Sequence, residues 1–230
     1  MTSGDRGQLL LDFPRIDADQ RPLIEAGPYR TVVAALRRWR EWPGGQLAVS
    51  GEAFSGRTRL LRWWAGEAGA AVVSGAALAR APIDEISSLS FSALAVDDAD
   101  APAPKDTGGM GLLAALNLCR DRGLPVLLAG AGEPVSWQKA PPDLVSRLRA
   151  MPVAHLDAPD DESLSLRLRE ECALRRLILP DESVAYLIKR MEHSWHAIGV
   201  VADQIERTKG RAETIPSARA VLVALGMDPG

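Results

Sequence analysis

Short apolar runs recur along the first two thirds of the chain, and each is bounded by Gly, Pro or Asp. Runs of four or five residues without polar alternation are typical of strands that are buried on both faces of a parallel sheet. Helix-like segments lie between them, which predicts an α/β domain with helices on both faces of a five-stranded parallel sheet. The strands are expected at residues 46–50, 70–74, 93–96, 125–129 and 153–156, and helices at 31–42, 57–68, 111–122 and 144–150.

The pattern changes after Pro159, where helical periodicity continues without an intervening strand-like run. Helices are predicted over residues 160–177, 181–191, 195–209 and 215–225. Leu164, Leu168 and Cys172 are spaced four apart, so they share one face of the first helix and are expected in its core. The chain therefore divides into a short N-terminal segment, an α/β domain and a small all-α domain, over residues 1–15, 16–158 and 159–230.

Composition and charge narrow the class of protein. The chain has 230 residues, of which 47% are hydrophobic, which is enough for a sizeable core. No apolar stretch reaches the length of a membrane span, and residues 1–15 lack the pattern of a signal peptide, which favours a cytoplasmic protein with no membrane partner. The formal net charge of −3 provides no overall field for DNA. Cys119 and Cys172 lack metal-ligand spacing and are interpreted as reduced structural thiols.

The stretch SGEAFSGRTR, residues 50–59, joins the first predicted strand to a helix. Its glycines and Thr58 match the GxxxxGK[ST] pattern of a phosphate-binding loop, but Arg57 occupies the lysine position. In such a loop, backbone N–H groups and the helix N-terminus bind phosphate, and the Thr58 hydroxyl reaches Mg²⁺. A strand–turn–helix whose glycines only form a turn is the alternative. The expected nucleotide-binding residues are Gly51, Ser55, Gly56, Arg57, Thr58 and Arg59.

The segment LAVDDAD ends another predicted strand in two carboxylates, Asp97 and Asp98. They are expected at the carboxyl edge of the sheet, beside the loop. Asp97 would hold Mg²⁺ through water together with Thr58, and Asp98 would orient an attacking water. A solvated strand end is the alternative.

Arginine at position 57 bears on hydrolysis. A guanidinium is permanently charged and can span two phosphate oxygens, but it is bulkier and flatter than an ammonium group. We therefore expect Arg57 to preserve binding of ADP or ATP and to impair hydrolysis, because the compact lysine charge follows the γ-phosphate through transfer. Compositional drift is the alternative, since 23 of the 27 basic residues are arginine.

The chain contains QLLLDF near the N-terminus, a P-loop with Gly-Arg-Thr, VDD, the segment PPDLVSRLRAMP and a terminal helical segment. Together these features resemble the Hda family, the DnaA-related AAA+ proteins that regulate bacterial replication initiation. The resemblance covers nearly the whole chain and implies an AAA+ P-loop domain followed by a helical lid. It also implies a nucleotide-bound, typically ADP-bound, negative regulator that stimulates hydrolysis of DnaA-bound ATP.

The resemblance implies two partner contacts. Arg147 matches the arginine finger that the family supplies to ATP on DnaA; Arg149 is the second candidate, and a simple helix-terminal cation is the alternative. The clamp-binding hexapeptide of the family, which docks on the beta subunit of DNA polymerase III, is matched by Gln8, Leu9, Leu11 and Phe13. A strand on the edge of the chain's own sheet is the alternative for this segment.

Two departures from the family predict weak or no hydrolysis by the chain itself. The strand over 126–129 runs into GAGEP and lacks the polar sensor-one residue, and His196, an expected nucleotide-binding residue, replaces the arginine of the second sensor. An autonomous AAA+ ATPase and an initiator-like DNA-binding protein are the competing functions. Sequence-specific DNA binding is not expected, because only residues 226–230 follow the last predicted helix. The sequence is compatible with a monomer or with a homodimer formed through the nucleotide face.

Overall fold

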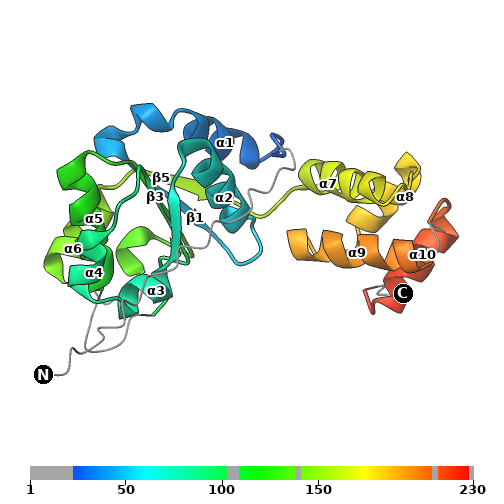
Figure 1. Cartoon of the computed structure of the whole chain (residues 1–230). Helices are drawn as coiled ribbons and strands as arrows, with labels where there is room; N and C mark the ends of the chain where they lie inside the picture. The colour runs from blue at the N-terminus through cyan, green and yellow to red at the C-terminus, as the bar shows by residue number, and fades with distance from the viewer. Residues whose placement is uncertain (1–22, 103–108, 138–140, 209–211, 228–230) are drawn as a thin grey trace, which may run out of the picture.

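A five-stranded parallel sheet forms the centre of the first domain (Figure 1). The computed structural model describes residues 23–102, 109–137, 141–208 and 212–227. The strand order β2-β3-β4-β1-β5 places β1 between β4 and β5, and every described pair is parallel. The predicted sheet is confirmed, and each strand lies within one residue of its expected bounds: β1 (Gln46–Gly51), β2 (Ala71–Ser74), β3 (Leu94–Asp97), β4 (Val126–Gly130) and β5 (Val153–Leu156).

Helices cover both faces of the sheet, because alternate strand residues point to opposite faces and most are apolar. Leu47 and Val49 of β1 pack in one core with α1 (Tyr29–Arg37) and α2 (Arg57–Ala68). Ala48, between them, faces a second core on the other side of the sheet. The helices that contribute to this second core are α3 (Gly75–Arg80), α4 (Ile83–Ser88), α5 (Met110–Arg122) and α6 (Pro142–Ala150).

Two parts of the helix prediction differ from the structure. The helix expected over 31–42 ends at Arg37 and is followed by the short 3-10 turns η1 (Trp39–Glu41) and η2 (Pro43–Gly45). Trp42 precedes a proline, which disfavours helical backbone, and its ψ of 134° is extended. The helices α3 and α4 were not predicted, because six residues are too few for an apolar period to show. A third 3-10 turn, η3 (Pro134–Ser136), follows β4.

In the second domain, the described residues form helices and no strand, as predicted: α7 (Asp161–Leu174), α8 (Asp181–Ile188), α9 (Trp195–Arg207) and α10 (Ile215–Ala224). Their apolar faces form a third core, which includes Leu164, Leu168 and Cys172. The N-cap side chains of Asp160, Ser194 and Thr214 each accept a backbone hydrogen bond from the residue three positions later. Figure 1 shows this domain beside the sheet domain, connected to it through the chain between β5 and α7.

Both cysteines carry free thiols in buried positions, in agreement with the prediction of structural thiols. Burial raises the pKa of Cys119 to about 12 and that of Cys172 to about 11. None of the helices in the described part of the chain combines the length and the apolar run that crossing a bilayer requires.

Candidate functional site

The loop between β1 and α2 turns tightly at two glycines. A Cβ added to the buried Gly51 would lie 2.6 Å from Ser55 Oγ and 2.9 Å from the carbonyl oxygen of Leu156, so only glycine fits there. Gly56 has φ +95°, a left-handed conformation that residues with a side chain rarely adopt. The first N–H groups of α2, which have no intrahelical partner, lie directly after this turn. The loop thus has the backbone geometry of an anion-binding turn.

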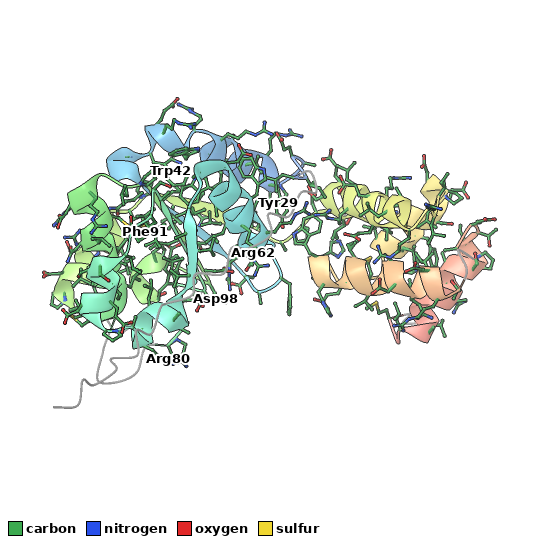
Figure 2. The ribbon with its side chains drawn as sticks, in the orientation of Figure 1. Tyr29, Trp42, Arg62, Arg80, Phe91 and Asp98 are labelled. Carbon is green, nitrogen blue, oxygen red and sulfur yellow. The ribbon has the colours of Figure 1, made fainter. Side chains whose placement is uncertain are left out.

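A cavity of about 600 Å³ opens between this loop, the carboxyl end of β3 and the first turn of α9. It brings together most of the predicted nucleotide-binding residues, namely Gly56, Arg57, Thr58, Arg59 and His196, with Asp98, the predicted water-orienting carboxylate. Ala53, Phe54, Arg62 and Trp195 complete its lining. Figure 2 labels Arg62 and Asp98, from α2 and the end of β3. The predicted residues therefore converge from both domains.

Ser55 differs from its neighbours in the loop. Its side chain is 2% exposed, and its Oγ is buried without a hydrogen-bond partner. The hydroxyl faces Gly51 inside the loop, and Ser55 is not among the residues that line the 600 Å³ cavity. Ser55 contributes its backbone carbonyl instead, which accepts hydrogen bonds from Tyr29 and Trp195.

Arg57 spans the loop from one side to the other. Its Nη1 donates a hydrogen bond to the carbonyl oxygen of Gly51, and its Nη2 lies 3.5 Å from Asp98 Oδ1. The Arg57 side chain is 13% exposed, whereas that of Asp98 is 61% exposed, so solvent screens this ion pair. The guanidinium is thus held at the mouth of the loop mainly by its backbone contact, in a cavity that two further arginines line.

Thr58 and Asp97 form the candidate magnesium site. Thr58 Oγ1 donates to Asp97 Oδ1 at 3.1 Å, and the backbone N–H of Asp98 donates to the same oxygen at 3.1 Å. Burial raises the pKa of Asp97, and the neighbouring Asp98 carboxylate raises it further. A bound cation would relieve this disfavoured negative charge. A hydroxyl and a carboxylate oxygen are ligands that Mg²⁺ accepts alongside water and phosphate, so the two residues fit that ion.

Tyr29 and Trp195, which the sequence analysis did not single out, join the two domains at the loop. The indole Nε1 of Trp195 lies 2.6 Å from Tyr29 Oη and 2.8 Å from the carbonyl oxygen of Ser55. The rings pack edge to face with centroids 5.0 Å apart, and Tyr29 also donates to the Ser55 carbonyl. Burial raises the pKa of Tyr29. Figure 2 labels Tyr29, the first residue of α1, on the side of the sheet domain that faces the helical domain.

Two aromatic contacts shape the rest of the site. Phe54, in the loop, has φ +61° and is 63% exposed, and its ring lies 5.5 Å from that of His196 in α9. At the end of β4, a Cβ added to Gly130 would lie 2.7 Å from the Trp137 ring. The strand end therefore has no room for a polar side chain at position 130.

The two candidate finger residues lie apart from this cavity. Arg147 and Arg149 are in the last turn of α6, where Arg147 is half-buried and Arg149 is exposed. Neither lines the 600 Å³ cavity, and neither forms a hydrogen bond or ion pair with the described residues. The predicted clamp-binding residues Gln8, Leu9, Leu11 and Phe13 lie outside the described residues.

No protein-family model matches the chain, and a search of curated proteins gives no match either. Domain III of the replication initiation protein DnaA from Thermotoga maritima matches with a TM-score of 0.72 and 19% identity, over 90% of this chain and 95% of that one. AMPPCP-bound DnaA from Aquifex aeolicus matches with a TM-score of 0.70 and 16% identity, over 83% of this chain and 65% of that one. The RuvB Holliday junction branch migration motor of Thermotoga maritima matches with a TM-score of 0.63 and 18% identity, over 87% of this chain and 68% of that one.

These likenesses show the fold. The chain has the AAA+ fold of DnaA domain III, with a five-stranded parallel sheet followed by a helical lid. It spans about two thirds of the length of the Aquifex protein that it matches.

Proposed function

We propose that this chain is a regulator of DnaA of the kind found in the Hda family, and a negative regulator of chromosomal replication initiation. It holds ADP or ATP with Mg²⁺ at its own loop, and it supplies Arg147 to ATP that is bound on DnaA. The clamp-binding segment with Gln8, Leu9, Leu11 and Phe13 tethers it to the DNA polymerase sliding clamp. The DnaA-type fold supports a replication-related AAA+ role.

The observation that carries this proposal is the separation of two arginines. Arg57 is engaged at the loop of its own domain, by the Gly51 carbonyl and Asp98. Arg147 lies on α6, outside that cavity, and has no partner among the described residues. A cation that has no partner in the described part of its own chain is suited to a site that a second molecule completes.

The cavity suits retention of a nucleotide more than its hydrolysis. The AMPPCP bound in the Aquifex DnaA supports an adenine nucleotide as the ligand here. Three arginines and Thr58 line the cavity, whereas Asp98, the candidate for orienting water, is exposed and lies beside the Arg57 guanidinium. No polar side chain fits at Gly130, and a histidine, His196, stands where the resemblance places an arginine. We therefore propose weak or no turnover by the isolated chain.

On DnaA, Arg147 would stabilise the charge that develops on the γ-phosphate in the transition state. A finger of this kind accelerates hydrolysis by about 10³–10⁵-fold. Arg149 lies two residues further along the same helix, about 200° around its axis, and so points elsewhere. Arg149 thus provides a matched control with the same charge, in the same helical turn.

The decisive experiment measures hydrolysis of ATP prebound to DnaA, with and without this protein and DNA-loaded clamp. We expect stimulation that requires both the protein and the clamp, and that Arg147→Ala removes. No stimulation by the unmodified protein would overturn the proposal. In a parallel arm without DnaA, the isolated chain should bind ADP and turn over ATP slowly or not at all; rapid turnover there would favour an autonomous AAA+ ATPase.

A further inference from the structure

The indole of Trp195 lies where three cavities meet at Gly56. The largest, described above, contains Arg57 and Thr58 and is the phosphate end of the proposed nucleotide site. A second, of about 370 Å³, is lined partly by charged residues of α2 and α7. The third has only about 20 Å³ and is lined by Leu23, Ile24, Tyr29, Gly56, Arg59, Leu60 and Trp195. Gly56, Arg59 and Trp195 line all three cavities, so the indole lies where they meet.

For a nucleotide whose phosphates lie at the start of α2, the two smaller cavities beyond Gly56 are the candidate positions for its base. The second cavity is polar, because Arg167 and Glu171 lie there, and Glu171 also pairs with Arg175 at 2.8 Å. The third is mostly apolar and includes an aromatic ring, which is the kind of surface that binds a heteroaromatic base. Its 20 Å³ suffices for about one or two water molecules and not for a base.

We propose that Trp195 occupies the nucleobase subsite of this chain's own nucleotide pocket, so that a base enters only when α9 withdraws the indole. The inference rests on the proposed nucleotide-binding function and adds a regulatory step to it. The indole is itself a bicyclic heteroaromatic ring, and its N–H donates to Tyr29 Oη and to the Ser55 carbonyl. The edge-to-face packing against Tyr29 holds it in place.

The contacts of Trp195 with Tyr29 and with the Ser55 carbonyl join the helical domain to the sheet domain. Trp195 is the first residue of α9, and its partners Tyr29 and Ser55 belong to α1 and the loop. Entry of a base therefore requires the first turn of α9 to move away from the loop. The apparent affinity for a nucleotide is the intrinsic affinity multiplied by the fraction of molecules in which the indole has left the subsite, because only those molecules can bind the base. Pyrophosphate has no base and can bind in the 600 Å³ cavity while Trp195 stays in place.

Titration calorimetry with ADP and with pyrophosphate, each with Mg²⁺, tests this inference. Trp195→Ala should bind ADP at least about tenfold more tightly than the unmodified chain, with pyrophosphate affinity unchanged within about twofold. Tyr29→Phe keeps the ring and removes one acceptor of the indole N–H, so it should tighten ADP binding by a smaller factor. Tyr186→Phe is the matched control, because that ring contacts Arg190 in the helical domain and lines none of the three cavities. It should change neither affinity.

The outcomes separate the inference from the function on which it rests. Unchanged or weaker ADP binding by both Trp195→Ala and Tyr29→Phe, with pyrophosphate binding intact, would overturn the base-subsite inference and leave the nucleotide site standing. Failure of the unmodified chain and of Trp195→Ala to bind either ligand would overturn both. Thermal denaturation of each variant without ligand shows whether a loss of binding is caused by a loss of fold. Tyr29→Phe is the more conservative substitution and serves the same purpose.

Discussion

Replacing Gly56 by alanine tests how closely the helical domain packs on the loop. Two costs are expected in the free energy of unfolding. The left-handed backbone, with φ +95°, disfavours any residue that has a Cβ, by about 1–2 kcal/mol. The new methyl group would also lie 2.6 Å from Trp195 Nε1 and 2.8 Å from its Cδ1, so the indole must move.

The second cost can be estimated from what Trp195 would lose. Its hydrogen bonds to Tyr29 Oη and to the Ser55 carbonyl contribute about 0.5–1.5 kcal/mol each. The edge-to-face contact with Tyr29 adds about 0.5–1.5 kcal/mol. Together with the backbone term, Gly56→Ala is expected to lower the free energy of unfolding by about 2.5–6.5 kcal/mol.

Gly123→Ala is the matched control, because Gly123 also has a positive φ, +64°, but nothing lies within 4 Å of its added Cβ. That variant should lose only the backbone term, about 1–2 kcal/mol. Urea denaturation followed by circular dichroism measures both. In a Trp195→Phe background, which lacks the indole N–H, the excess cost of Gly56→Ala should shrink. Equal losses for Gly56→Ala and Gly123→Ala would refute the close packing of Trp195 on the loop.

Three further predictions concern the partner contacts and the carboxylate. Arg147→Ala should slow hydrolysis of DnaA-bound ATP by about 10³-fold and leave the chain's own ADP affinity intact, whereas Arg149→Ala should have a much smaller effect; the reverse order would reassign the finger. The double substitution of Gln8 and Leu9 by alanine should abolish clamp binding in surface plasmon resonance without changing the melting temperature; unfolding instead would identify an internal strand. Burial and Asp98 raise the pKa of Asp97 above its usual 3.8, so its ionisation destabilises the fold as pH rises. Asp97→Asn should therefore raise the free energy of unfolding of the nucleotide-free protein at pH 7, but not at a pH below the usual carboxyl pKa. If urea denaturation gives the same difference between the variant and the unmodified protein at both pH values, this prediction is wrong.

The sheet could be predicted because its strands carry their own signal. The run QLAVS has three consecutive apolar residues at its centre, as is typical of a strand buried on both faces, and glycine follows it where the chain turns. The proximity of Thr58 and Asp97 could be predicted from the same topology, because β1 and β3 both end at one edge of the parallel sheet. The hydrogen bond between the Thr58 hydroxyl and the Asp97 carboxylate lies at that edge.

The contact between Tyr29 and Trp195 could not be predicted in this way. The two residues are 166 positions apart, and neither follows a motif or a period that would indicate a partner. Trp195 follows the N-cap Ser194 at the start of α9, a position that local sequence marks only as the beginning of a helix. The role of Ser55 was hidden for a similar reason, because a loop motif does not say whether a side chain or its carbonyl makes the contact.

The ring of Trp137 over Gly130 has a consequence for the history of the chain. Any larger residue at 130 would collide with a ring that is 4% exposed and donates to the carbonyl oxygen of Gly132 at 2.9 Å. Enlarging Gly130 first costs about 1–3 kcal/mol of overpacking, and removing the Trp137 ring first costs about 3–5 kcal/mol through the space it leaves. A descendant with a polar strand end at position 130 must pass through one of these destabilised intermediates or acquire both changes together. The pair therefore makes a polar side chain at this strand end harder to acquire than a single codon change would suggest.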